Sequence, residues 1–78
     1  MQLNELSYLQ TIAQQHSISA AAAKLNLSQQ RLSRIVQNIE NELGFKIFTR
    51  SKKGVSLTKD GVQFMKYLQN ILTAYEDM

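Results

Sequence analysis

Apolar side chains recur at intervals of three and four residues through the first half of the chain, with polar residues between them. Leu6, Leu9 and Ile12 follow this spacing, which predicts a first amphipathic helix over residues 4–15. A second, shorter helix is expected over residues 20–25, AAAAKL, with Ser19 as its N-cap and Asn26 as the left-handed residue that ends it. Because alanine has almost no bulk, another helix can pack closely against this segment.

The stretch SQQRLSRIVQNIE, residues 28–40, predicts a third helix with a single apolar face. Ser28 is its expected N-cap, and Gly44 is expected to close it. The apolar positions fall at i, i+3, i+4, i+7 and i+11, namely Leu32, Ile35, Val36, Ile39 and Leu43. Two helices joined by a short turn, the second with an unusually polar outer face, are typical of a helix-turn-helix.

After Gly44 the pattern changes from helical spacing to short β-branched and aromatic runs. FKIFTR and GVSL flank SKKG, which predicts a two-stranded hairpin with Gly54 at a positive φ. Thr58 is the expected N-cap of a fourth, long helix that extends to about Tyr75. The predicted fold is therefore mainly α: a winged helix-turn-helix of three helices and a two-stranded β wing over residues 1–58, followed by a linker helix over 59–78.

The outer face of the third helix carries the chemistry that reads DNA bases. Helical spacing places four polar residues opposite the apolar face: Gln30, Arg34, Gln37 and Asn41. Arg can bridge guanine O6 and N7, and Gln or Asn can bridge adenine N6 and N7. The alternative interpretation is an ordinary solvated helix face. The alanine-rich partner helix and the basic hairpin favour the DNA-reading interpretation.

The hairpin tip concentrates three cations, Arg50, Lys52 and Lys53, on one turn. Residues 24–59 contain eight Lys or Arg against two Glu, a net charge of +6, whereas the whole chain carries +3. Such an asymmetry is expected of a surface that binds a polyanion. The tip is accordingly expected to lie on the phosphate backbone or in a minor groove. A solvated turn that keeps the protein soluble is the alternative.

Composition argues against several other classes of protein. The chain has 78 residues, no Cys and one His, which leaves little material for an enclosed catalytic cavity, a thiolate or a metal site. We therefore expect no enzyme activity, no cofactor and no metal. No apolar run approaches the roughly 18 to 20 residues that cross a bilayer, so we expect no membrane association and a cytoplasmic location.

Taken together, the motifs resemble the N-terminal DNA-binding domain of the LysR-type transcriptional regulators. The resemblance covers nearly the whole chain and is carried by LxxLxxIA from Leu6, SISAAAxxLxLSQ from Ser17, LSxI from Leu32, IExELG from Ile39, IFxR from Ile47 and LTxxG from Leu57. It implies a winged helix-turn-helix, a linker helix that pairs two subunits, and a C-terminal domain that binds a small co-inducer. The chain is then either a module of such a longer regulator, which we favour, or a naturally short relative. A co-inducer is expected only if the C-terminal domain exists.

Under this resemblance, residues 29–42 form the recognition helix in the major groove and residues 50–54 form the wing. Gln29, Ser33 and Arg34 match DNA-contacting positions of the family, whereas Gln30 and Arg31 depart from the Pro or small residues often found there. His16 stands where the family often has Gly and is expected in a surface turn. The complete set of expected DNA-binding residues is Ser28, Gln29, Gln30, Arg31, Ser33, Arg34, Gln37, Arg50, Lys52 and Lys53.

The long helix is expected to pair with the same helix of a second subunit. Such a homodimer would recognise an interrupted dyad in double-stranded DNA, with half-sites about 34 Å or a multiple apart. One alternative is that Phe64, Leu68 and Ile71 instead pack back on the first helix of the same chain. Another is a protein-interaction module that docks a different protein through this helix. The residues expected in the pairing seam are Phe64, Met65, Leu68, Ile71, Leu72 and Tyr75.

Overall fold

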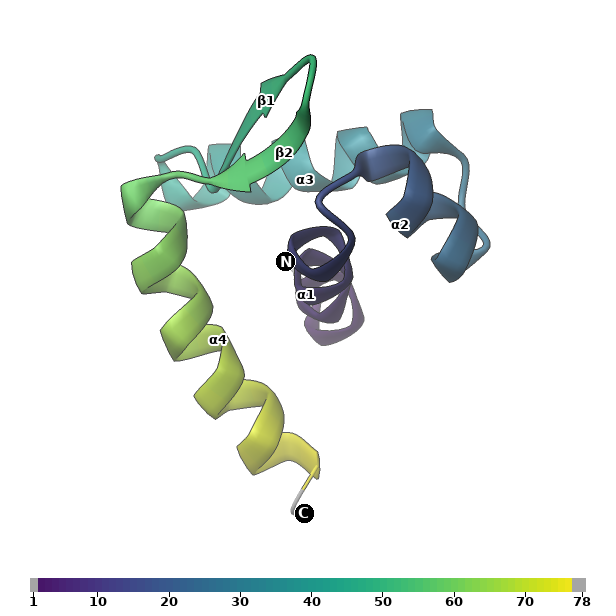
Figure 1. Ribbon diagram of the computed structural model, residues 1–78. Coiled ribbons are helices and arrows are strands. Elements are labelled where there is room, and N and C mark those ends of the chain that lie inside the picture. The colour runs from purple at the N-terminus through teal and green to yellow at the C-terminus, as the bar shows by residue number, and fades with distance from the viewer. Residues whose placement is uncertain (1, 77–78) are drawn as a thin grey trace.

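The computed structural model describes residues 2–76 and contains four helices and one hairpin (Figure 1). The hairpin stands above α3, and α4 extends away from it past α1 (Figure 1). The mainly α, winged helix-turn-helix architecture predicted from the sequence is confirmed. In chain order the elements are α1 (Leu3–Gln15), α2 (Ile18–Leu25), α3 (Gln29–Leu43), β1 (Phe48–Ser51), β2 (Gly54–Leu57) and α4 (Lys59–Glu76).

The turn between α1 and α2 differs from the prediction. The N-cap of α2 is Ser17, whose hydroxyl oxygen accepts a 3.0 Å hydrogen bond from the amide of Ala20, so the expected N-cap at Ser19 is wrong. Helix α2 therefore begins two residues earlier than expected, with Ile18 packed against the core. His16 ends α1 in the left-handed region, with φ of 54°.

The caps around α3 follow the prediction. The Ser28 hydroxyl oxygen accepts from the amide of Arg31 at 3.1 Å, and Asn26 ends α2 with φ of 59°. Gly44 ends α3 with φ of 84°. These local contacts satisfy amides and carbonyls that a helix end leaves without partners. They fix the angle at which α3 leaves the turn.

The hairpin pairs Phe48 with Leu57 and Ser51 with Gly54, which leaves Lys52 and Lys53 as a two-residue turn. Strand β1 begins at Phe48, so residues 45–47 of the FKIFTR run lie before the strand. Gly54 has the expected positive φ, 121°, and a side chain there would collide with the carbonyl oxygen of His16.

Helix α4 begins directly beneath the hairpin. Thr58 is its N-cap, as expected: its hydroxyl oxygen accepts from the amide of Gly61 at 2.9 Å and donates to the carbonyl of Lys46 at 2.6 Å. Gly61 is buried, and an added Cβ there would meet the carbonyl of Ile47. The start of α4 is thus locked to the base of the hairpin.

One hydrophobic core holds all these elements together. Its buried members come from every helix and from both strands: Leu9, Ile12, Ala21, Ala22, Leu32, Val36, Ile39, Ile47, Phe48, Val55, Leu68 and Leu72. Alanines from α2 allow the close approach that the sequence predicts. Within residues 2–76 no helix is long and apolar enough to cross a membrane.

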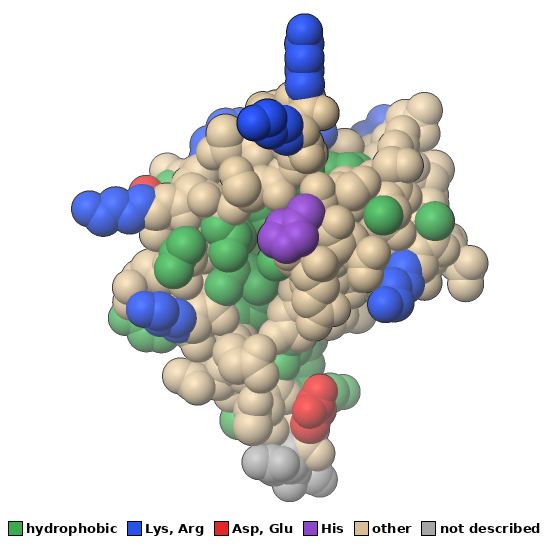
Figure 2. Space-filling view, viewed as in Figure 1, with side chains coloured by type: hydrophobic (Ala, Val, Ile, Leu, Met, Phe, Trp, Pro, Cys, Tyr) green, Lys and Arg blue, Asp and Glu red, His purple; other side chains and the backbone are tan. Residues whose placement is uncertain are grey.

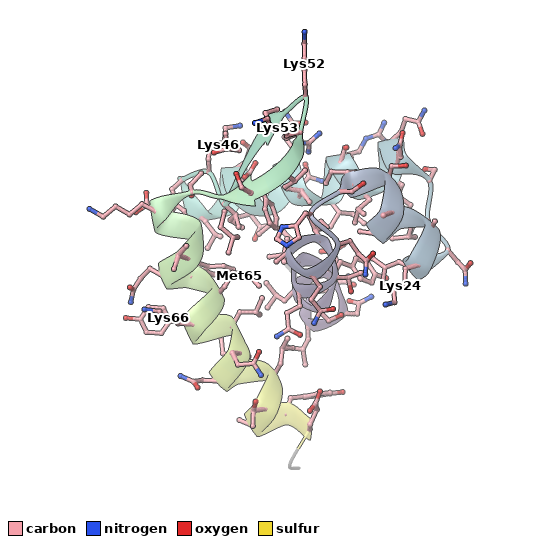
Figure 3. The ribbon with its side chains drawn as sticks, in the orientation of Figure 1. Lys24, Lys46, Lys52, Lys53, Met65 and Lys66 are labelled. Atoms are coloured by element: carbon pink, nitrogen blue, oxygen red, sulfur yellow. The ribbon has the colours of Figure 1, made fainter. Side chains whose placement is uncertain are left out.

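The core takes up part of the expected pairing seam of α4. Leu68 and Leu72 are buried within this single chain, so they are not available to a second subunit. Phe64 and Met65 pack partly against the same core, and Met65 points toward α1 (Figure 3). The pairing prediction is therefore narrowed to the exposed residues of the helix, and the division of the chain at residue 58 stays a prediction.

Candidate nucleic-acid interface

The outer face of α3 is exposed and polar along its first three turns. Ser33 is half-buried at the edge of this face, on the side of the hairpin. Between Gln29 and Asn38 the helix carries no acidic residue. The predicted base-reading residues Gln29, Gln30, Arg31, Arg34 and Gln37 are all exposed. The structure thus brings these side chains onto one accessible surface.

A hydrogen bond connects the hairpin with the recognition helix. The Arg50 guanidinium donates from Nη1 to the Ser33 hydroxyl oxygen at 3.2 Å. Arg50 therefore lies beside α3, although the sequence places it with the wing tip. Its remaining N–H groups are free to form hydrogen bonds with phosphate or base acceptors, because a guanidinium has five donors.

The tip of the wing carries the two lysines that the sequence predicts. Lys52 projects from the hairpin away from the rest of the molecule, with Lys53 beside it (Figure 3). The amide of Lys53 donates to the Ser51 hydroxyl oxygen at 3.3 Å, which holds the turn. Both ammonium groups are exposed and can approach a phosphate.

Positive charge is less concentrated in space than along the sequence. On the face drawn in Figure 2, Lys and Arg side chains gather around the hairpin end of the molecule. Lys24, which the sequence counts in the +6 segment, lies instead on the α2 side, away from the wing tip (Figure 3). The basic surface therefore consists mainly of the hairpin and the adjoining face of α3.

Glu40 is a residue that sequence reasoning missed. Its side chain is only 8% exposed, and its Oε2 accepts hydrogen bonds from the amides of Ile47 at 2.7 Å and Phe48 at 3.2 Å. Its Oε1 lies 3.8 Å from the ammonium of Lys46. The signal was present in the helical spacing, since Glu40 falls beside Val36 at the border of the apolar face.

Two depressions flank Arg50 and complete the candidate interface. One runs between α3 and β1 and includes Ser33, Gln37, Glu40 and Lys46 in its lining. The other lies between the N-terminus of α2 and the hairpin, where Ser17, Ser19 and Gln29 meet Arg50. Both linings combine apolar side chains with hydroxyl, amide and guanidinium groups. Such groups supply hydrogen bonds to a phosphate backbone without reading its sequence.

The chain matches characterised families and proteins over most of its length. Residues 3–62 match the family described as "Bacterial regulatory helix-turn-helix protein, lysR family". BsdA, an HTH-type transcriptional regulator of Bacillus subtilis (strain 168), is 42% identical over 78 residues, which cover 99% of this chain and 27% of BsdA. A probable RuBisCO transcriptional regulator of Emiliania huxleyi is 40% identical over 75 residues, covering 96% of this chain and 24% of that protein. The chain spans about a quarter of the length of these relatives.

Solved structures with the same fold include complexes with DNA. The BenM DBD in complex with catB site 1 DNA has a TM-score of 0.93 and 35% identity, covering 100% of this chain and 84% of that chain. The CbnR DBD–DNA complex has a TM-score of 0.92 and 31% identity, covering 99% of this chain and 88% of that chain. Full-length CbnR, described as a LysR family transcriptional regulator, gives a TM-score of 0.91 at 31% identity, covering 99% of this chain and 27% of that chain.

Proposed function

Because the chain belongs to the lysR family of bacterial regulatory helix-turn-helix proteins, we propose that it binds double-stranded DNA sequence-specifically as the DNA-binding part of a transcriptional regulator. The observation that carries this proposal is the exposed, acid-free face of α3 beside a cationic hairpin. Similar proteins support it, because the curated relatives include transcriptional regulators and the solved structures include complexes with DNA.

The recognition helix enters the major groove with its exposed amides and guanidinium groups toward the bases. A groove about 12 Å wide admits one helix. Gln29, Gln30, Arg34 and Gln37 are the base-reading residues, with Arg31 on the flank of the same face. Ser28 and Ser33 hold the phosphate backbone through their hydroxyl groups. Ser28 is the N-cap of α3, where free amides also favour anions, and Ser33 lies in the second turn beside the hairpin.

The wing contacts the DNA beside the recognition helix. Lys52 and Lys53 contact phosphates or enter the minor groove, whereas Arg50 contacts the DNA close to α3 because Ser33 holds its guanidinium there. This arrangement divides the interface into a sequence-reading helix and a charge-driven wing. The two parts respond differently to salt and to base sequence.

Two copies of the chain pair through the exposed side of α4. Tyr67, Ile71 and Tyr75 lie one helical turn apart and are 59%, 48% and 61% exposed, an unusual exposure for large apolar side chains. Pairing buries them and sets two recognition helices on one face of a DNA dyad. The exposure of these same residues also favours the second candidate function, a module that docks a different protein.

The small-molecule co-inducer stays a prediction, because it requires a C-terminal effector domain.

A salt titration of duplex binding tests the proposal. The apparent affinity for mixed-sequence duplex falls steeply with salt, because each phosphate that the protein neutralises contributes about 0.9 to the slope of log affinity against log salt. Replacing both Lys52 and Lys53 by Ala lowers the slope by about 1.8 and weakens binding to all sequences alike. Fluorescence anisotropy at several salt concentrations measures both effects.

Arg34→Ala separates sequence reading from charge. On duplexes enriched from a random library, this change lowers the preference over mixed sequence by about 1 to 3 kcal/mol. Asn38→Ala, an exposed change on the flank of the same helix, is the control. Absence of duplex binding at low salt, in a protein with native circular dichroism, would contradict the proposed function.

A further inference from the structure

Glu40 makes the contact that joins the recognition helix to the wing. It lies at the start of the last turn of α3, and its Oε2 accepts from the amides of Ile47 and Phe48, the residues where the chain enters β1. Ile47 directly precedes β1 and Phe48 is in the first pair of the hairpin, with Leu57, so the carboxylate holds the base of the wing. Glu40 itself is turned inward and does not belong to the DNA-facing surface.

A carboxylate in this position is costly unless its partners compensate. Removing a carboxylate from water is unfavourable, and hydrogen bonds from two N–H groups offset that cost. The ammonium of Lys46 lies 3.8 Å from Glu40 Oε1, but the Lys46 side chain is 72% exposed, so this ion pair contributes little to stability. The energetically important partners of Glu40 are therefore the two backbone amides of the wing.

The base of the wing acts on its tip through leverage. Lys52 follows Phe48 by four residue steps, about 13 Å at roughly 3.3 Å per residue of extended strand. A tilt of about 10° at Phe48 therefore moves the tip by roughly 2 Å, which is comparable with the length of a hydrogen bond. A small error in the direction of β1 is thus enough to take the lysines away from a phosphate.

The other wing contacts do not replace the one made by Glu40. The amide of Val55 donates to the His16 carbonyl at 3.0 Å, which ties β2 to the turn between α1 and α2. The amide of Thr58 donates to the Ile47 carbonyl at 2.9 Å, which ties the hairpin to α4. The exposed Arg50–Ser33 hydrogen bond also connects β1 with α3, at a point further along the strand.

We infer that Glu40 is a positioning residue, which sets the direction of the β1–β2 hairpin relative to α3 and thereby the place where Lys52 and Lys53 meet the DNA. The inference rests on the proposed function for its consequence on DNA. Its structural part, the hold of one carboxylate on two amides, concerns the free domain alone.

Two conservative variants separate the effect of side-chain length at position 40 from the effect of its charge. Glu40→Gln keeps the length of the side chain and a carbonyl oxygen that accepts both amides, but it removes the charge. Glu40→Asp keeps the charge but is one methylene too short to reach them. Positioning predicts that Glu40→Gln retains the wild-type salt slope, whereas Glu40→Asp lowers the slope by about 1.8, as loss of both lysine contacts does. Glu42→Gln, on the same helix, controls for the change of net charge.

A double-mutant cycle shows whether the effect passes through the wing. In the Glu40→Asp background, replacing Lys52 and Lys53 by Ala changes the slope no further, because those contacts are already lost. A merely structural role would lower thermal stability and leave the contribution of the lysines intact. An additive effect of the lysines, or a normal slope in Glu40→Asp with a lowered slope in Glu40→Gln, overturns the inference.

Hydrogen exchange in the free domain keeps this test separate from the proposed function. The amides of Ile47 and Phe48 exchange about tenfold faster or more in Glu40→Asp, and at close to the wild-type rate in Glu40→Gln. If the wild-type domain fails to bind duplex, the proposed function fails, yet these exchange rates still decide whether Glu40 holds the wing. Equal exchange rates in wild type and Glu40→Asp overturn the inference whatever the outcome with DNA.

Discussion

His16 serves two parts of the fold with its backbone. It ends α1 in a left-handed conformation, and its carbonyl accepts from Val55 in the wing. A residue with a side chain is strained at a φ of 54°, whereas glycine is not. We expect His16→Gly to keep the carbonyl contact and to stabilise the domain by about 0.5 to 1 kcal/mol, a rise in Tm of roughly 4 °C.

Thermal unfolding followed by circular dichroism measures this change. Gln14→Gly, in an exposed position of α1 just before His16, is the matched control. It lowers the free energy of unfolding by about 1 kcal/mol, because glycine is unfavourable inside a helix. A lower Tm for His16→Gly than for wild type would mean that the imidazole contributes more than the left-handed backbone costs.

Residues whose role depends on near neighbours in the chain were predictable. Ser28 and Asn26 act on backbone groups within a few positions, so their sequence context is sufficient. Ser17 and Ser19 flank the same helix start, and burial of Ile18 against the core favours Ser17. The partners of Glu40 come from a strand that has no helical register with it, so spacing alone does not reveal them.

At the scale of elements, the junction of the wing with α4 depends on one small residue. Gly61 lies against the carbonyl of Ile47, with no room for a Cβ. We expect Gly61→Ala to push α4 away from the hairpin base and to destabilise the domain by about 2 kcal/mol, because overpacking a close backbone contact forces the backbone to shift.

Chemical denaturation measures that loss as a lower midpoint at an unchanged slope. Asn70→Ala, on an exposed face of the same helix, is the control and is expected to be close to neutral. A Gly61→Ala variant as stable as wild type would show that α4 can move without cost, and the lock between wing and helix would then be refuted.

The elements themselves were largely predictable, but the face that each one buries was less so. Hydrophobic spacing identified all four helices and the hairpin, because period and turn residues are local properties. Helix α4 carries apolar residues around more than half its circumference, which left the choice of inner face open. Packing against α1 determines which face is buried. Leu68 and Leu72 lie in the core, and Gln10 Nε2 donates a hydrogen bond to Gln69 Oε1 at 2.8 Å.

At the scale of the whole molecule, the outer residues of α4 determine the proposed dimer. Ile71→Lys places a charge in the pairing surface without touching the core, so we expect it to yield monomers. Val62→Lys is a matched control, because Val62 is 44% exposed against 48% for Ile71 and lies on another side of the helix. Sedimentation equilibrium distinguishes the two variants, and a dimer that survives Ile71→Lys would contradict pairing through this face.

The wing is attached to the helices at its base. Within residues 2–76, the hydrogen bonds that connect it with the helices involve residues 47, 48, 50, 55 and 58, and none of these bonds reaches the two-residue turn. The turn can consequently be rewritten without endangering the fold. Substitutions of Lys52 and Lys53 therefore adjust the affinity of the domain for any duplex without changing its sequence preference. In an engineered regulator, the turn is the position at which affinity can be set separately from specificity.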